Sequence, residues 1–211
     1  MKSLFIAVLF LFILVGCGES GTKPNNSNNV ILPLAVGNSW QFVYYSTHDL
    51  YNDTIKHDRF KTNYVTETIT LEGETWYNFA SDGKNTDLIF TNRSDGLYGI
   101  FKNRDDHAEI PYHLDSARLG YKYPVILHES YPNDTNGLYI ASTNIKIKTD
   151  AGTFNCIKYV PSNYKNVEHY GTYMCPGIGF IRAVGITHIQ QTESGPDTTW
   201  TVQELVSYTI H

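Results

Sequence analysis

The spacing of apolar residues limits the possible folds of this chain more than any other feature, because it follows the two-residue period of β-strands. From Val30 onward, no window of eleven or more residues shows the 3.6-residue apolar period of an amphipathic helix. Residues 63–71 alternate instead, with Val65, Ile69 and Leu71 on one face and mainly threonines on the other. This period of two predicts a protein built from strands.

Turn-forming clusters divide the same region into about ten strands. Ser94-Asp95-Gly96 lies between two strand-like segments and predicts a hairpin. We expect further strands at residues 123–128, 153–160 and 168–174, and one helical turn at 113–119. The sequence therefore predicts one all-β domain at residues 30–211 with mostly antiparallel strands, as a curved sheet, an open barrel or a sandwich.

The first seventeen residues predict export and lipidation. Lys2 provides a positive start, and the apolar run at residues 4–15 is shorter than the roughly 20 residues that span a bilayer core. The run ends in Leu14-Val15-Gly16-Cys17, which resembles the lipobox of bacterial lipoproteins. This resemblance implies that residues 1–16 are a signal peptide and that Cys17 carries a diacylglycerol thioether, with palmitate or a similar acyl chain attached.

Residues 17–29 are expected to be the lipidated cysteine followed by a flexible tether. Positions 18–29 read GESGTKPNNSNN, a small and polar stretch whose typical reach as a coil is about 20 Å. Gly18 stands where an aspartate retains lipoproteins at the inner membrane of enterobacteria, so we expect anchoring at the outer membrane. The membrane, reached through Cys17, is therefore one expected partner in the cell envelope.

Net charge and aromatic content limit the kinds of molecule that the protein can bind. The 16 Lys and Arg against 21 Asp and Glu give a net charge of −5, so no basic excess exists to bind nucleic acid. The 16 Tyr, 10 Phe and 3 Trp have two interpretations. They either line a ligand-binding surface or fill the half-buried face of a sheet.

Three separated blocks resemble a group of bacterial lipoproteins. Residues 31–44, which include Trp40, resemble the PL-x-x-GN-x-W-x-Y opening of many uncharacterised lipoproteins from Bacteroidetes-like bacteria. Residues 152–156 resemble a G-x-F strand of the same group, and 173–182 resemble its PG-x-G-x-[IV]-[KR] strand entry. The resemblance implies a secreted β-domain and brings no activity with it.

No catalytic or metal-binding motif is complete in the sequence, and we expect no cofactor. The spacings of zinc proteases, serine hydrolases and phosphate-binding loops are all missing. Residues 104–109, with His113 and Asp115 beyond them, form either a metal or acid–base site or a solvated loop. Residues 132–137 faintly resemble a calcium loop, but Pro132 occupies a ligand position, so a turn is the better interpretation.

The cysteine count predicts one disulfide. Lipidation of Cys17 leaves Cys156 and Cys175, an even number in an exported protein. If their strands pair antiparallel about a centre between Lys165 and Asn166, the two cysteines lie directly opposite each other, within disulfide range. The alternative is a pair of free, buried thiols.

Three functions remain open at this point. We favour a non-catalytic, lipid-anchored envelope protein whose β-domain binds a partner or an apolar ligand. A glycan-acting hydrolase is an alternative, since its two carboxylates need no local sequence pattern. A carbohydrate-binding surface protein with exposed Trp and Tyr is another. A deep apolar cavity, a cleft with facing acids or a flat aromatic strip would distinguish the three.

Overall fold

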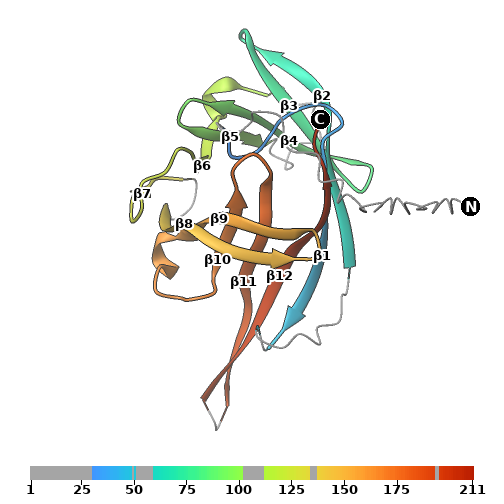
Figure 1. The fold of residues 1–211 in the computed structure, drawn as a ribbon. Helices are drawn as coiled ribbons and strands as arrows, with labels where there is room; N and C mark the ends of the chain where they lie inside the picture. The colour runs from blue at the N-terminus through green and yellow to red at the C-terminus, as the bar shows by residue number, and fades with distance from the viewer. Residues whose placement is uncertain (1–29, 49, 51–58, 102–111, 134–136, 193–194) are drawn as a thin grey trace, which may run out of the picture.

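The protein folds into one antiparallel sheet of twelve strands, which confirms the all-β prediction. In this computed structural model, the residues described are 30–48, 50, 59–101, 112–133, 137–192 and 195–211 (Figure 1). The strands follow the order β6-β5-β4-β3-β2-β1-β12-β11-β10-β9-β8-β7. Because β1 pairs with β12, the sheet consists of two meanders joined at the first and last strands.

The strand bounds fall into these two halves. The first half comprises β1 (Ser39–Thr47), β2 (Arg59–Leu71), β3 (Glu74–Ser81), β4 (Lys84–Arg93), β5 (Gly96–Phe101) and β6 (Arg118–Lys122). The second comprises β7 (Ser130–Tyr131), β8 (Leu138–Thr149), β9 (Gly152–Pro161), β10 (Gly171–Cys175), β11 (Gly179–Thr192) and β12 (Gly195–Thr209). Two short 3-10 turns, η1 (Leu114–Ser116) and η2 (Ser162–Tyr164), complete the elements. No helix within the described ranges is long and apolar enough to cross a membrane.

The local sequence explains the strands that were predicted. The alternating segment 63–71 is the second part of β2, and the expected helical turn near residue 114 is η1. The Ser94-Asp95-Gly96 cluster closes the β4–β5 hairpin, with Arg93 paired to Gly96. Gly96 has a φ of +152°, and a Cβ there would lie 2.3 Å from the backbone oxygen of Tyr121. The turn therefore requires glycine on steric grounds.

The prediction of a strand at residues 123–128 is wrong. The structure has β6 at Arg118–Lys122 instead, followed by a loop that leads to the short strand β7. Pro124 has no backbone N–H to donate to a neighbouring strand, and His128 has a φ of +67°. The apolar residues Ile126 and Leu127 in this loop are exposed.

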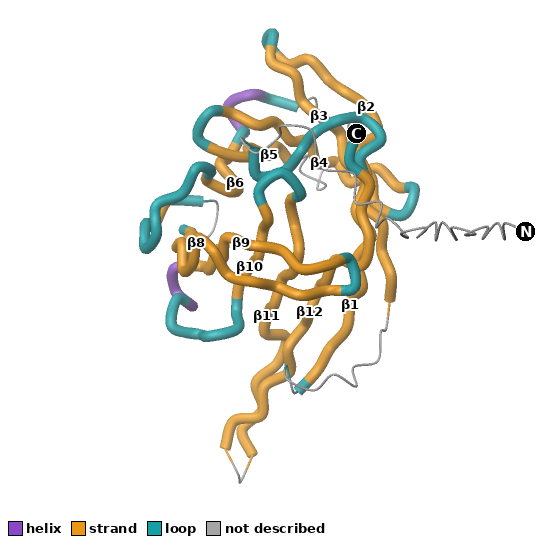
Figure 2. Tube along the Cα trace, viewed as in Figure 1, coloured by secondary structure: helices purple, strands orange, loops and turns teal. Residues whose placement is uncertain are grey.

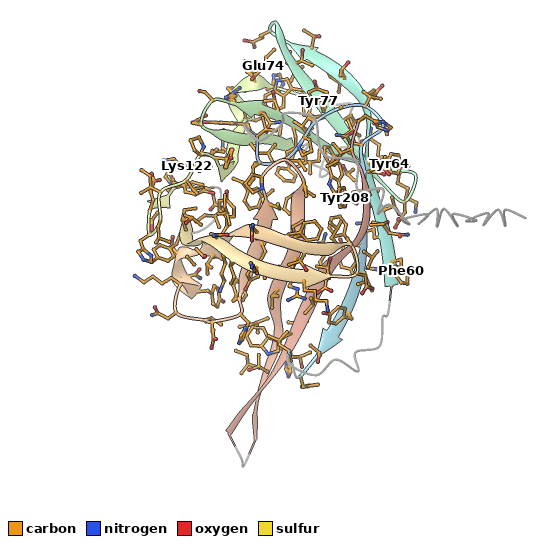
Figure 3. All side chains as sticks on the ribbon, viewed as in Figure 1. Phe60, Tyr64, Glu74, Tyr77, Lys122 and Tyr208 are labelled. Atoms are coloured by element: carbon orange, nitrogen blue, oxygen red, sulfur yellow. The ribbon has the colours of Figure 1, made fainter. Side chains whose placement is uncertain are left out.

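The sheet curves until its β6 edge meets the second half of the chain (Figure 2). Tyr159 on β9 donates a hydrogen bond to the backbone oxygen of Lys122 at 2.8 Å. Lys122, at the end of β6 (Figure 3), also forms an ion pair with Glu129. The backbone N–H of Lys122 donates to the hydroxyl of Tyr131 on β7. Side chains therefore bridge the two ends of an open sheet where no strand ladder closes it.

A second layer forms where the β8–β9 hairpin folds over the sheet. β8 pairs with β7 and β9, yet it also contacts β11 and β12, and the hairpin lies across them (Figure 1). Its register shifts at residues 140–145 allow the strand to bend. Phe154 then packs edge-on against Tyr208 with ring centroids 6.1 Å apart.

The first and last of the three sequence blocks of the lipoprotein resemblance meet in space. The indole Nε1 of Trp40 donates to the backbone oxygen of Ile178 at 2.7 Å, and the N–H of Gly177 donates to Val30. Gly179, with a φ of +101°, packs against Leu32 so closely that a Cβ would lie 2.3 Å from the Leu32 Cδ1 atom. These blocks therefore join the start of the domain to β11, which is a structural role.

Candidate ligand-binding cavity

The curved sheet encloses a cavity of about 660 Å³ on its concave face. This volume lies within the range of about 300–1,000 Å³ that is usual for small-molecule sites. Its wall comes from strands far apart in the sequence, including β1, β4, β5, β6, β10, β11 and β12. The apolar part of the wall consists of Leu88, Phe90, Phe101, Leu119, Tyr121, Leu138, Phe180, Ala183 and Val184.

A second cavity of about 350 Å³ adjoins the first. Shared side chains form both walls, so the two spaces lie side by side within the sheet. The second cavity extends towards β2 and β3 and adds Trp40, Phe42 and Phe79 to the apolar wall. The residues common to both walls are Tyr44, Leu88, Phe90, Tyr121, Thr172, Phe180, Ala183 and Gln203.

Aromatic rings give these walls their shape. Phe79 and Phe90 meet edge to face at 4.9 Å, and Tyr121 packs edge-on against both Phe180 at 5.3 Å and Tyr159 at 5.1 Å. Such packing fixes the rings in place. Other aromatic side chains, such as Trp76, Tyr131 and Tyr173, are buried in the core, as the packing interpretation of the aromatic content predicts.

A small set of polar groups lies between the two cavities. Tyr44 and Gln203 face each other across the β1–β12 ladder, and Tyr121 hydrogen-bonds Thr172. Burial raises the pKa of Tyr44 and the pKa of Tyr121 above their usual values, so both phenols are neutral hydrogen-bonding groups at physiological pH. A mostly apolar wall with a few polar groups is typical of sites that orient a ligand.

The rim of the larger cavity carries exposed aromatic and polar residues. Phe101 lines this cavity although 65% of its surface is exposed, which places it at the mouth. Tyr170 also lines the cavity and stacks on Tyr164 with ring centroids 4.6 Å apart. Arg118 at the same cavity donates hydrogen bonds to the backbone oxygens of Asp115 and Ala117. The cavity is thus open to solvent beside β5 and β6.

Sequence patterns could not identify these wall residues. Tyr44, Phe90, Tyr121 and Phe180 are far apart in the chain and share no local motif. They lie together because β6 curves towards β9 and β10. Only the abundance of aromatic residues hinted at such a wall.

The other sequence-predicted site residues lie elsewhere. Cys17, residues 104–109 and residues 134–136 are outside the described part of the chain. His113 and Asp115 are exposed at η1, where the backbone oxygen of His113 accepts a bond from Ser116. Across the residues that the structure describes, no three His, Cys, Asp or Glu side chains group as a metal site.

The cysteine pair shows the predicted register without a disulfide. Pairing of Lys158 with Tyr173 and of Ile157 with Met174 confirms the predicted centre between Lys165 and Asn166. Cys156 and Cys175 nevertheless remain free thiols. The ladder ends at Met174, and the thiols donate to different backbone oxygens, that of Cys156 to Phe154 at 3.9 Å and that of Cys175 to Pro176 at 3.7 Å.

The exposed aromatic side chains do not come from one strand. Phe60 on β2 is 56% exposed and Tyr208 on β12 is 39% exposed (Figure 3). Phe101 belongs to β5 and Tyr164 to η2. The apolar cavity is the feature of the fold that corresponds to the first of the hypotheses drawn from the sequence.

Comparison with known proteins places the chain beside exported proteins of similar structure. No protein-family model matches the sequence, and no curated protein matches it. A Bacteroides fragilis protein, described as exported and with a YmcC-like fold, shares 14% identity at a TM-score of 0.45. That similarity covers 86% of this chain and 100% of the other. A Parabacteroides distasonis protein described as a lipoprotein shares 12% identity at a TM-score of 0.37, over 86% of this chain and 99% of its own. Neither similarity brings an activity or a ligand to this chain.

Proposed function

We propose that this protein is a lipid-anchored protein of the cell envelope that binds an apolar ligand inside its curved sheet. The observation that carries the proposal is the pair of adjoining cavities, about 660 Å³ and 350 Å³, with largely apolar and aromatic walls. Burial of an apolar ligand there is favourable at about 25 cal/mol per Å² of apolar surface removed from water.

The chemistry of the walls supports binding over hydrolysis. A glycoside hydrolase needs two carboxyl groups that face each other across its substrate. The described residues that line the two cavities include no aspartate and no glutamate. Their polar groups are phenols, amides, hydroxyls and two cations, which can orient a ligand without cleaving it.

The anchor and the domain are proposed to act together. A diacylglycerol on Cys17 and a tether over residues 18–29 would hold the domain within about 20 Å of the membrane surface. The described structure begins at Val30, whose backbone oxygen accepts a hydrogen bond from the backbone N–H of Gly177, just before β11. The cavity would then stay close to the lipids of the outer membrane, which are a source of apolar ligands.

Binding of a neutral fluorescent probe tests this proposal. The protein is residues 17–211 with Cys17→Ser, so that no attached acyl chain competes for the cavity. N-phenyl-1-naphthylamine, which fluoresces in apolar surroundings, should show saturable binding to the folded protein and none after unfolding in urea. Fluorescence that rises linearly with probe, or equally with unfolded protein, would contradict the proposed function.

A further inference from the structure

The charged side chains that line the two cavities are both cations. Lys61 lines the smaller cavity and Arg118 the larger one, and no acidic side chain accompanies them among the described lining residues. The whole chain carries a net charge of −5, so this selection of cations runs against its composition. A ligand that fills the cavities therefore meets positive charge.

The register of the sheet directs Lys61 into the smaller cavity. Lys61 on β2 pairs with Phe42 on β1, and Asn63 pairs with Trp40. Directly opposed residues point to the same face of a sheet, and Phe42 and Trp40 line the smaller cavity. Lys61 and Asn63 therefore place two polar groups at one end of an apolar wall.

The hydrogen bonds around this end leave donors for a ligand. Ser81 donates its hydroxyl proton to the Oδ1 atom of Asn63 at 2.8 Å, which leaves the Nδ2 group of Asn63 as a donor. The Nζ atom of Lys61 has no hydrogen bond or ion pair with another described residue. The nearby carboxylate of Asp82 accepts the backbone N–H of Thr62 at 2.8 Å.

The remaining wall suits an extended apolar chain. From Lys61 the smaller cavity continues past Phe90 and Phe180, which also line the larger cavity. The larger cavity includes Gly185, where a Cβ atom would find no other atom within 4 Å. The two cavities together provide polar groups at Lys61 and Asn63 beside walls that are mostly apolar.

We propose that the ligand is an anionic amphiphile with a single acyl or alkyl chain, whose head group is bound by Lys61 and Asn63. This inference rests on the proposed function and names the ligand class for the same site. The anion accepts charge-assisted hydrogen bonds from the Nζ atom of Lys61 and an ordinary one from the Nδ2 group of Asn63. The chain passes between Phe90 and Phe180 into the larger cavity.

Displacement of N-phenyl-1-naphthylamine by four matched amphiphiles tests the inference. Myristate, tetradecyl phosphate, tetradecanol and tetradecyltrimethylammonium share the chain length and differ in head charge, and each is used below its micelle-forming concentration. The protein is again residues 17–211 with Cys17→Ser. The two anions should displace the probe at about tenfold lower concentration than the alcohol, and the cation should be weakest. The two anionic arms distinguish a carboxylate from a phosphate ligand.

Three variants assign the head group. Lys61→Gln should remove the preference for anions while the neutral probe still binds. Lys146→Gln, at an exposed lysine on β8, is the control and should keep that preference. Arg118→Gln tests the other cation of the cavity walls. Equal displacement by myristate and tetradecanol from the unaltered Lys61 protein would overturn this inference and leave the proposed function standing. Loss of the preference in Arg118→Gln, with Lys61→Gln unaffected, would overturn the assignment to Lys61. Failure of the neutral probe to bind at all would overturn the proposed function, and this inference with it.

Discussion

The hydroxyl of Tyr159 donates a hydrogen bond to the backbone oxygen of Lys122 at 2.8 Å, and so joins β9 to the outermost strand of the other half of the sheet. The two residues are 37 positions apart and lie on strands that do not pair with each other. The contact holds β6 against β9, and β6 provides Leu119 and Tyr121 to the cavity wall.

Tyr159→Phe is expected to destabilise the domain by about 1 kcal/mol, since it removes this bond and leaves the partly buried carbonyl of Lys122 with one fewer partner. Equilibrium unfolding in urea measures the change. Tyr164→Phe is the matched control, because Tyr164 is 38% exposed and stacks through its ring. Equal stabilities for the two variants would show that the bond does not hold the edges together.

The contact between Gly179 and Leu32 gives a second prediction. Gly179→Ala and Gly73→Ala both place alanine at a positive φ, +101° and +87°, and each incurs about 1–2 kcal/mol of backbone strain. Gly73 has no atom within 4 Å of an added Cβ, whereas Gly179 would press on buried Leu32. Gly179→Ala should therefore cost a further 1–3 kcal/mol, roughly, from overpacking. Equal urea midpoints for the two variants would contradict the close packing of Gly179 against Leu32, which joins the first and last sequence blocks.

The anchor is tested at Cys17. In the native bacterium, Cys17→Ser should abolish labelling with radioactive palmitate and leave the precursor unprocessed, because the thioether needs the cysteine sulfur. Cys156→Ser is the control and should keep both labelling and processing. Palmitate labelling that persists in Cys17→Ser would exclude the lipobox interpretation.

We expect the alkylation of the buried thiol of Cys156 to depend on pH. Burial, together with a smaller contribution from the neighbouring Cys175, raises the pKa of Cys156 to about 12. Below a raised pKa the thiol keeps its proton, and the reactive species is the thiolate. Alkylation of Cys156 by iodoacetamide in reduced, folded Cys175→Ala protein should therefore be slow at pH 8 and accelerate towards pH 12. Unfolding should restore fast alkylation at pH 8, and fast alkylation of the folded protein would show that Cys156 is accessible.

A disulfide remains the prediction for protein isolated from the oxidising envelope. The confirmed β9–β10 register, if extended by one residue beyond its last pair, Ile157 with Met174, would set Cys156 opposite Cys175, so a small shift of the turn at Pro176 would bring the sulfurs together. Thiol titration of denatured, unreduced protein decides the question. The disulfide predicts no reactive thiol, and two per chain would exclude it.

The sequence predicted those parts of the fold that depend on neighbouring residues. Three local patterns are found in the structure: the alternation of residues 63–71, the turn at Ser94-Asp95-Gly96, and the antiparallel pairing of β9 and β10 about a centre between Lys165 and Asn166. The wrong prediction of a strand at residues 123–128 also has a local cause, because Pro124 interrupts an otherwise apolar segment.

The cavity depends on how strands far apart in the chain curve towards each other, and no local pattern reports that. Lys61 shows the difference. In the sequence it is one lysine in a polar segment, and only its pairing with Phe42 places it on the cavity wall.

The most direct test of the central claim is to fill the cavity from within. Gly185 lines the larger cavity, and a Cβ atom added there would find no other atom within 4 Å, so we expect Gly185→Phe to occupy the volume without disturbing the sheet. Thr209→Phe adds the same ring to an exposed position of β12 and serves as the control. With folding verified by circular dichroism, the account predicts that Gly185→Phe weakens N-phenyl-1-naphthylamine binding by about tenfold or more, equivalent to about 1.4 kcal/mol, and that Thr209→Phe leaves it unchanged. Unaltered probe binding by folded Gly185→Phe would contradict the claim that the curved sheet holds its ligand in this cavity.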